Sequence, residues 1–546
     1  MAGQPLSVDV WRLIFQEVEN NELYDLCLVS KTFNSIATPL LYRSINLIAP
    51  ELDPERMWRS RAKEDEKEQE IDKRLRGHWN LLSRLEDAPN ETLRNYVQEL
   101  DLSTKKGPRL IDQDFIVHLA SWDRLCRVIR RLPNLRRVTL GIDKLQTDEM
   151  IDTINTHPRQ PELILIIQDG GKKPLSKTPL PSVTNLTISV NPFDESKGEN
   201  TRVLAVQDLL FACPNLRSLS LAVYWKYGGC VYRMPRYPAT TSFRFTGTEV
   251  FPPIEELTLN GYKMHDGEWP HWRERFDWSE LSSLTLGPQD TSGILGRFAG
   301  YATSLRTLKV WRYQGERSEG REDLTAFLAS FESLRELEVK GFICDVGAIA
   351  GHTGLERLCL HEDESAREGK QRRVLSVEDL EVLDRGCPRL RTLMVDIKRG
   401  DGQLPMQVLA KLATGFSNLT SLSLHFELGL PDTKHPITPT LNYTSVRSIG
   451  QAFFDERRRS RIPIPSNYTL TIWTGNSYRR WPQWEPPYAT FEKKYTATYE
   501  IRLSESTGSN GEVEVRHLQK ESLDAYPKRG EGDVLSRPGY PHRSFS

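Results

Sequence analysis

The segment CPNLRSLSL, from Cys213 to Leu221, carries the pattern that decides the fold. The same frame returns as LPNLRRVTL from Leu132 to Leu140 and as CPRLRTLMV from Cys387 to Val395. The last two apolar residues of L-x-x-L-x-L are two apart, so both point to one side of a short strand. The residues between them point to the other side. The pattern therefore predicts a series of strands with one buried face.

Further copies of this frame extend along most of the chain, and helix-compatible runs with apolar residues at three- and four-residue spacing lie between them. Clear copies are Phe251–Leu259, Trp278–Leu286, Ala302–Val310, Phe331–Val339, His352–Leu360 and Phe416–Leu424, with weaker ones at Val97–Leu102 and Leu180–Ile188. The helical runs are Val203–Ala212, Asp323–Ser330, Val377–Arg385 and Met406–Thr414. The mean spacing is about 32 residues, or about 29 if Leu163–Ile167 is an irregular strand, the upper end of leucine-rich repeats.

This periodicity predicts an α/β fold, an irregular leucine-rich-repeat solenoid. One such unit leaves its apolar strand face uncovered, so neighbours stack into a curved parallel sheet with helices on the convex side. Leu216, Leu219, Leu221 and their equivalents are the expected core. A (β/α) barrel also alternates strand and helix, but it needs eight units of more even length.

Composition narrows the function classes. The 546 residues contain 73 Lys and Arg against 74 Asp and Glu, for a net charge of −1, which gives no support to nucleic-acid or membrane binding. The seven cysteines form no C-x-x-C pair, which is typical of free thiols in a reduced compartment. No secretory signal or membrane span is expected. These features predict a cytoplasmic or nuclear protein, or one present in both.

Residues 1–47 do not fit the repeat and predict a short helical module. An apolar face at helical spacing is formed by Val10, Leu13, Ile14 and Val18, and a second by Leu23, Leu26, Val29, Phe33 and Ile36, ending at Pro39. Ser7 and Asp9 stand where they would cap and charge the first helix. So small a core needs help from a partner or from the adjoining solenoid.

The same residues spell a known motif: Leu6-Ser7-Val8-Asp9-Val10, then Ile14-Phe15, then Leu26-x-x-Val29-Ser30-Lys31-x-Phe33, and Leu41-Tyr42. This resembles an F-box, with Ser7 where proline is usual; serine can cap the helix instead. In that family the box docks on the small adaptor of cullin-RING ubiquitin ligases. Carried over by position, the implied adaptor-facing residues are Leu6, Val10, Ile14, Val29, Lys31 and Phe33. A helical cap on the solenoid, with these side chains packed internally, is the alternative.

The resemblance implies a non-catalytic substrate-recognition subunit of an SCF-type ubiquitin ligase. Its partners would be the adaptor, the cullin and a protein substrate whose identity stays open, with no cofactor or metal. A repeat scaffold that binds a protein outside any ligase is the alternative. A hydrolase on the barrel fold is a more distant third.

No catalytic constellation is visible in the sequence. Gly170 to Lys173 lacks the spacing of a phosphate loop, and His361 to Glu364 lacks the second histidine of a zinc protease. His265 and His271 flank a Trp-rich loop without further ligands. Nothing places a nucleophile beside a base, so the chain is predicted not to be an enzyme.

A binding surface is predicted on the concave side of the sheet. The position just past each strand reads Asn260, Gly287, Trp311, Lys340, His361, Asp396 and His425, and stacking aligns these residues as a ladder. Mixed aromatic and charged groups suit recognition of a protein segment. Trp311, Lys340, His361, Asp396 and His425 are the candidate substrate-binding residues. Ordinary solvated variation on a sheet face is the alternative.

The expected domains follow from these signals. They are the F-box at 1–47, a charged linker or helix at 48–92, the solenoid at 93–475, a C-terminal cap at 476–503 and a disordered tail at 504–546. Trp481 to Tyr488, rich in Trp and Pro, is assigned to the cap, with a ligand groove as the alternative. The tail is assigned from its polar, glycine-containing composition.

Overall fold

The computed structural model describes about two thirds of the chain, and two compact units meet in its sequence between Ile254 and Glu255. Each unit is described by itself. The described residues are 6–47, 76–103, 122–142, 148–167, 179–190, 201–223, 243–262, 264–287, 291–311, 319–362, 364, 372–399, 402, 404–428, 437–438, 440–475, 496–504 and 512–518. The predicted charged stretch 48–75 and the Trp/Pro segment 481–488 lie outside these residues.

The first unit begins with three helices, α1 (Val8–Gln16), α2 (Asn20–Val29) and α3 (Lys31–Arg43). Their shared core contains Phe15, Leu23, Ile36 and Ala37, all almost fully buried. The Ser7 hydroxyl caps α1 by accepting the N–H of Val10 at 3.4 Å, as the sequence predicts.

Ser30 caps the N-terminus of α3, as Ser7 caps that of α1. Its hydroxyl accepts the N–H of Phe33 at 3.1 Å, and its extended backbone separates α2 from α3. The helix ends at Arg43, and β1 (Ser44–Asn46) follows at once and pairs in parallel with β2 (Glu99–Leu102). The helical module is therefore continuous with the repeat sheet.

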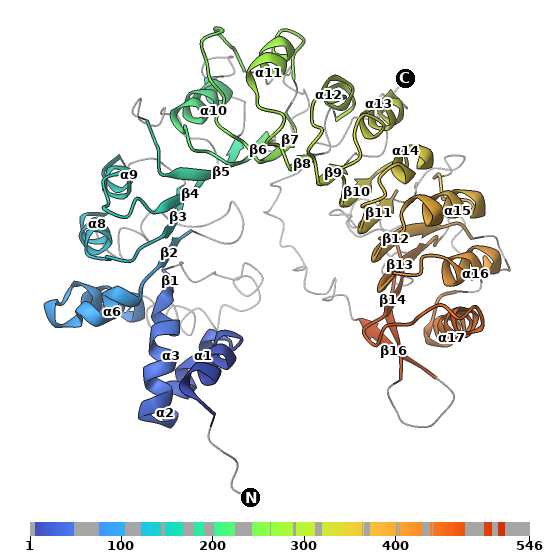
Figure 1. Cartoon of the computed structure of the whole chain (residues 1–546), viewed down its shortest axis with the longest axis horizontal. Helices are drawn as coiled ribbons and strands as arrows, with labels where there is room; N and C mark the ends of the chain where they lie inside the picture. Colours follow the sequence, from blue (N-terminus) through green and yellow to red (C-terminus); the bar gives the residue numbers. More distant parts are fainter. Residues whose placement is uncertain are drawn as a thin grey trace, which may run out of the picture. The chain divides into compact units, whose positions relative to one another are not determined.

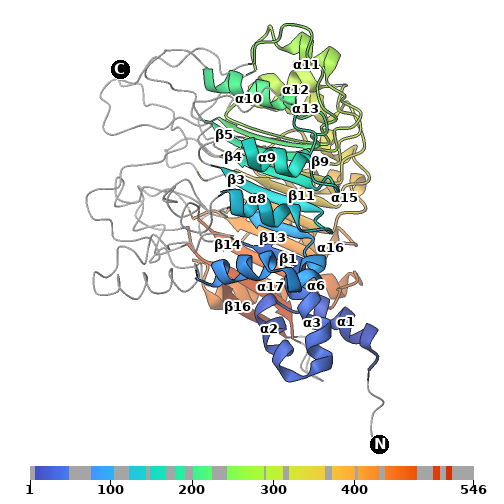
Figure 2. The same ribbon diagram turned by 90° about the vertical axis from the view of Figure 1, so that its left-hand side faces the viewer.

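The rest of the first unit is a parallel sheet whose strands pair in chain order, with the helices along one face (Figure 1). Its later strands are β3 (Arg137–Ile142), β4 (Glu162–Ile167), β5 (Val183–Val190) and β6 (Ser218–Val223). Its helices are η2 (Ala88–Asn90), α6 (Glu91–Tyr96), α8 (Trp122–Arg130), α9 (Asp148–Asn155) and α10 (Thr201–Ala212). Figure 2 gives the side view, in which α8 and α9 lie one above the other.

Part of the predicted linker belongs to this packed unit. Residues 76–86 are helical, and Leu82 and Leu85 are each only 1% exposed. Glu86 also pairs with Arg124 of α8 at 2.7 Å. Of the two forms predicted for 48–92, a charged linker or a helix, residues 76–86 take the helix, and its apolar side chains Leu82 and Leu85 are buried.

The second unit repeats the architecture, again with helices along one face of a parallel series. Its parallel strands are β7 (Glu256–Asn260), β8 (Ser283–Leu286), β9 (Thr307–Trp311), β10 (Glu336–Lys340), β11 (Arg357–His361), β12 (Thr392–Ile397), β13 (Ser421–Phe426) and β14 (Thr469–Thr474). Its helices are α11 (Trp269–Arg275), α12 (Thr291–Phe298), α13 (Glu319–Leu328), α14 (Val346–Ala350), α15 (Val377–Gly386), α16 (Met406–Thr414) and α17 (Tyr443–Arg459).

Two antiparallel strands finish the second unit. β15 (Thr498–Leu503) pairs with β14, and β16 (Val513–Leu518) pairs with β15. The strand β16 lies inside the predicted disordered tail, so that prediction is wrong for these residues. Val513 and Val515 alternate with charged neighbours and are buried, which is the ordinary signature of a half-buried strand.

The apolar strand positions form the core that the sequence predicts. Leu216, Leu219 and Leu221 are at most 1% exposed, and the strands show the expected alternation of buried and partly exposed residues. Within each unit the strands pair in chain order, and the second unit ends on antiparallel strands, which a closed parallel barrel does not contain, so the barrel alternative is wrong. The structure is a mixed α/β repeat solenoid of leucine-rich-repeat type. No helix among the described residues is long and apolar enough to cross a membrane.

Candidate functional site

The sheet register brings the predicted ladder together in the second unit. Lys340 of β10 pairs with Trp311 on one side and with His361 on the other. Asp396 of β12 pairs with His425 of β13, and His425 pairs in turn with Trp473 of β14. The predicted alignment of these positions is confirmed, whereas their role in binding a substrate stays a prediction.

Two of the five candidate substrate-binding residues remain accessible. Trp311 and Lys340 are both partly exposed, and Lys340 Nζ lies 5.5 Å from the centroid of the Trp311 ring. The indole Nε1 of Trp311 is buried and has no hydrogen-bond partner among the described residues. Lys340 Nζ also pairs with Glu338 Oε1 at 2.5 Å, so this position offers an aromatic ring beside an ion pair, a mixture that suits a protein partner.

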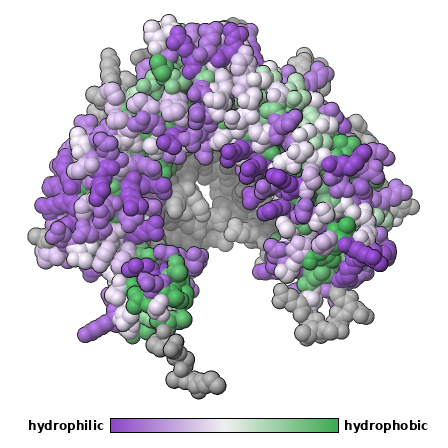
Figure 3. Space-filling view, in the orientation of Figure 1, coloured by the Kyte–Doolittle hydropathy of each residue, from purple (hydrophilic) through white to green (hydrophobic). Residues whose placement is uncertain are grey.

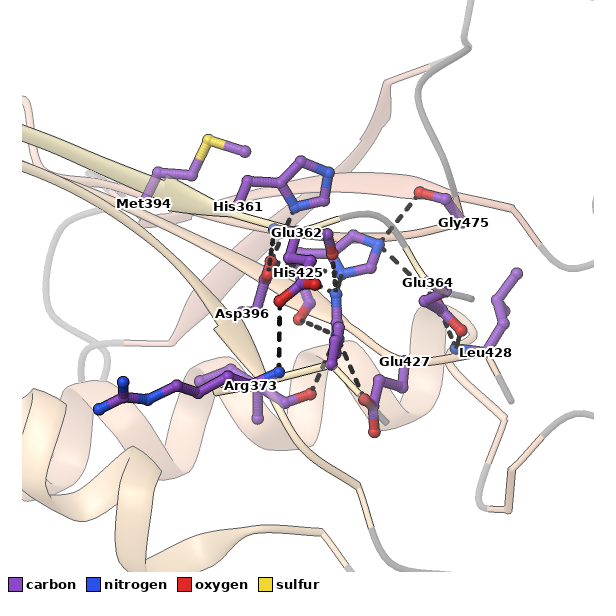
Figure 4. Close-up of polar contacts among 12 residues, drawn as sticks. His361, Glu362, Glu364, Arg373, Met394, Asp396, His425, Glu427, Leu428 and Gly475 are labelled. Atoms are coloured by element: carbon purple, nitrogen blue, oxygen red, sulfur yellow. Dashed lines mark hydrogen bonds and ion pairs between the residues drawn. The ribbon is translucent and has the colours of Figure 1, made fainter. Parts of the chain in front are cut away.

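The other three candidate substrate-binding residues are buried, contrary to the exposed surface that the sequence predicts. His361, Asp396 and His425 are 3%, 2% and 0% exposed. Figure 4 shows their side chains converging from neighbouring strand ends. His361 Nδ1 lies 2.8 Å from Asp396 Oδ1, so the ring nitrogen donates to the carboxylate. We name these three residues and Arg372 the buried polar cluster.

Arg372 holds the cluster together. Its Nη1 lies 2.6 Å from His425 Nδ1 and 3.4 Å from Asp396 Oδ1, and its Nε donates to Glu427 Oε1 at 3.0 Å. The same Nη1 donates to the Glu362 carbonyl oxygen at 3.1 Å. One guanidinium therefore meets groups from three successive strand ends, as its planar fork of donors allows.

The tautomer of His425 follows from its neighbours. Arginine only donates, so His425 Nδ1 accepts from Arg372, and Nε2 carries the hydrogen and donates to the Gly475 carbonyl oxygen at 3.1 Å. The pKa of His425 lies well below its ordinary value, mainly because the ring is buried, and further because of the charge of Arg372 and the neighbouring His361. His425 is therefore neutral at physiological pH.

Carboxylate groups, an aromatic ring and a glycine turn surround the cluster. Both carboxylate oxygens of Glu364 accept the N–H of Leu428 at 2.9 Å. Burial raises the pKa of Glu362. The Trp473 ring packs edge-on against the His425 ring, with centroids 4.2 Å apart. Gly475 has a φ of +77°, a conformation that glycine adopts without strain and that shapes the turn presenting its carbonyl.

The cluster includes the only group of metal-ligand type found among the described residues, His361, Asp396 and His425. Their ligand atoms lie within 4.8 Å of one another. The Arg372 guanidinium already occupies the lone pair of His425 Nδ1 and neutralises Asp396. A divalent cation would have to displace this fixed positive charge, so the geometry favours an internal ion network over a metal centre.

Sequence reasoning missed Arg372 and Trp473 as parts of this site. Trp473 occupies the next position of the ladder after His425, so extending the ladder to β14 would have found it. Arg372 lies outside the repeat frame, between β11 and α15, and no periodic signal marks it.

A second candidate surface lies on the N-terminal helices. Figure 3 shows hydrophobic residues gathered there. Among the predicted adaptor-facing residues, Leu6 is 49% exposed, Val10 39%, Ile14 42% and Val29 66%. Leu13 and Leu28 add to this surface at 64% and 72%. We name these six residues the apolar helix surface.

The other two predicted adaptor-facing residues are placed differently. Lys31 is exposed at the start of α3. Phe33 is half-buried, and its ring centroid lies 4.9 Å from that of Trp11 and 5.1 Å from that of Phe15. The structure thus turns Phe33 into the core of the module, because the three small helices have few other large side chains to fill it.

The Trp-rich loop has a structural explanation. Glu268 is 3% exposed and accepts hydrogen bonds from Tyr262 Oη at 2.5 Å and from Trp272 Nε1 at 3.4 Å. His265 Nδ1 accepts the N–H of Gly267 at 3.1 Å. These contacts organise the turn before α11 and place no nucleophile beside a base.

Comparison with known proteins gives a limited result. A scan against protein-family models and a search of curated proteins each found no match. Among solved structures, the chain is similar to a leucine-rich-repeat protein of Leptospira interrogans, with 15% identity over 64% of this chain and 72% of that chain. The TM-score is 0.25, so the likeness adds nothing about function.

Proposed function

We propose that this chain is the non-catalytic substrate-recognition subunit of a cullin-RING ubiquitin ligase of the SCF type. In this proposal the N-terminal helices are an F-box that binds the adaptor, and the repeats bind a target protein. Two features support it: the F-box-like residues of the first three helices, and a repeat fold of a kind suited to protein binding. A cytoplasmic or nuclear location follows from the proposal.

The apolar helix surface is the observation that carries the proposal. Helix α1 has two apolar faces: Trp11 and Phe15 pack inward, whereas Val10 and Ile14 stay exposed. Fully burying one such aliphatic side chain contributes roughly 1.5–3 kcal/mol, so leaving several in water is unfavourable for an isolated chain. Exposed apolar side chains gathered on one small module, as in Figure 3, are typical of a protein interface.

The alternative of a purely internal helical cap predicts burial of these same side chains. The module does join the sheet through α3 and β1, but Ile14 and Val29 are 42% and 66% exposed. The solenoid therefore leaves this face uncovered, as docking on an adaptor requires.

Substrate binding is proposed for the accessible part of the ladder. Trp311 and Lys340 lie side by side on adjacent strands and both reach solvent. His361, Asp396 and His425 are assigned a supporting role, because their burial denies a partner direct contact in this conformation.

The test is binding of purified adaptor to the full chain. Ile14→Asp combined with Val29→Asp should abolish binding, because burying uncompensated charge in an apolar interface costs several kcal/mol. Gln16→Asp is the matched control, because residue 16 lies about 200° around α1 from Ile14 and is exposed. It should bind normally.

Circular dichroism should show that all three proteins stay folded. Undiminished adaptor binding by the double variant would refute the assignment of this surface. If wild-type chain binds no adaptor or cullin at all, the repeat scaffold outside a ligase becomes the better function.

A further inference from the structure

A cavity of about 630 Å³ opens in the first unit, remote in sequence from both surfaces described above. It lies where successive helices turn back toward their strands, and equivalent turns of neighbouring repeats stack side by side. Figure 2 shows α8 and α9, whose C-terminal ends contribute to it, on the helix-covered side of this unit. Its lining residues are Glu91, Arg94, Arg130, Arg131, Pro133, His157, Pro158 and Arg159.

The lining has a strong excess of positive charge. Four arginines line the cavity, three of them exposed, against a single acidic residue, Glu91. Arg130 also lies 3.7 Å from Glu149, but both side chains are more than half exposed, so this pair is screened by water. Arg131 and Arg159 have no ion-pair partner among the residues that the structure describes.

Backbone carbonyl groups hold the arginines in place without cancelling their charge. Arg131 Nη1 donates to the Glu86 carbonyl oxygen at 2.6 Å, and Arg159 Nε donates to that of Pro133 at 3.1 Å. Arg94 Nη1 donates to the Asp87 carbonyl oxygen at 2.7 Å. A guanidinium has five N–H donors, so Arg131 and Arg159, each anchored by one of these bonds, keep donors for a further acceptor.

One of the lining residues is a buried histidine. His157 is 4% exposed, and its Nδ1 accepts the N–H of Arg159 at 3.2 Å. Burial lowers the pKa of His157, and the charge of Arg159 lowers it further. The neutral ring therefore supports the turn that carries Arg159 and adds no charge of its own.

We propose that this cavity binds a phosphate monoester, carried by a phosphorylated protein segment or by a free small molecule. A phosphate monoester brings close to two negative charges and three acceptor oxygens at neutral pH. Arginine forks match these oxygens with paired hydrogen bonds. The volume lies within the usual range of small-ligand sites. The proposal stands whether or not the N-terminal helices bind an adaptor.

A phosphodiester polymer is the less suitable ligand. Each of its phosphates carries one charge, and nucleic-acid binding usually adds aromatic side chains on which bases stack. The residues lining the cavity include no aromatic ring other than His157, which is buried. The lining, rich in arginine and without an exposed aromatic ring, therefore favours one doubly charged group over a polymer backbone.

The experiment measures binding of three probes to the full chain at constant ionic strength, because salt alone weakens any charge interaction. The probes are free phosphoserine, a short phosphoserine peptide and its unphosphorylated form. The phosphorylated peptide should bind at least tenfold more tightly than the unphosphorylated one. Tighter binding of the peptide than of free phosphoserine indicates a protein segment as the ligand, and equal binding indicates a small phosphate.

Variants assign the binding to the cavity. Arg131→Ala with Arg159→Ala should weaken phosphopeptide binding at least tenfold, and Arg131→Glu alone should do the same if the double variant folds poorly. Arg137→Ala is the matched control: this arginine is 48% exposed and pairs with Glu162 outside the cavity, so its loss should change affinity less than twofold. Equal affinity for both peptides, an unchanged affinity in Arg131→Glu, or tighter binding of a single-stranded oligonucleotide would each overturn the proposal.

Discussion

Removing Arg372 tests the buried polar cluster most directly. Its side chain is 2% exposed and stands 3.4 Å from Asp396, whose side chain is 0% exposed, and 3.0 Å from Glu427. Arg372→Ala leaves the Asp396 carboxylate buried without its cation. Removing one partner of a buried ion pair typically costs about 3–5 kcal/mol.

The contacts that survive place the expected cost near the lower end of that range, at about 3 kcal/mol. Asp396 keeps hydrogen bonds from His361 Nδ1 at 2.8 Å and from the Glu362 N–H at 2.7 Å. The Glu427 side chain is 19% exposed and can turn toward water. Arg372→Ala with Asp396→Ala should cost less than the sum of the single changes, because the two partners leave together.

Urea unfolding followed by far-UV circular dichroism gives the free energies, and hydrogen exchange of β11 to β14 locates the change. Arg458→Ala is the control, because its pair with Asp455 is 34% and 45% exposed and should contribute about 0–1 kcal/mol. An Arg372→Ala cost equal to that of the control, with unchanged exchange in these strands, would refute the network.

Two further predictions concern the same unit. The pKa of His425 is lowered on folding, so below pH 6.5 the unfolded state binds a proton that the folded state does not, and stability decreases as the pH is lowered. His425→Gln should therefore reduce the dependence of the urea midpoint on pH between pH 5 and 6.5. An unchanged dependence would contradict this. Trp311→Ala with Lys340→Ala should weaken capture of the protein partner by about 2 kcal/mol without lowering the melting temperature. Glu378→Ala with Glu381→Ala on α15 is the control, and loss of capture there alone would move the binding site.

The repeat frame made most of the fold predictable, because its signal is local and recurs. One copy of the frame, such as that of Leu216, Leu219 and Leu221, predicts a strand, its buried face and its place in the series. The strand β16 was missed for the opposite reason: Val513 and Val515 are only two apolar residues in a polar stretch, and their burial depends on pairing with β15.

The candidate sites were predictable only in register. The alternation of buried and exposed residues along each strand correctly predicted that Trp311, Lys340 and His361 are aligned. It does not predict which side chains cover each position. Arg372 covers the last ladder positions from a segment outside the frame, and its contacts span up to 55 residues of sequence. The stacked arginine turns of the first unit also lie outside the frame, so only the folded structure brings Arg131 and Arg159 to one cavity.

The position of Arg372 has a consequence for how the second unit unfolds. Repeats in a solenoid ordinarily contact only their neighbours, so stability is close to a sum of local terms. Arg372 contacts the Glu362 carbonyl after β11, Asp396 of β12 and His425 of β13, and it thereby links three successive strands through one side chain. Loss of any one strand removes a partner from the buried Arg372 guanidinium, which is costly. These repeats should therefore unfold together as one cooperative segment. Without the buried charges, each repeat could unfold locally by itself.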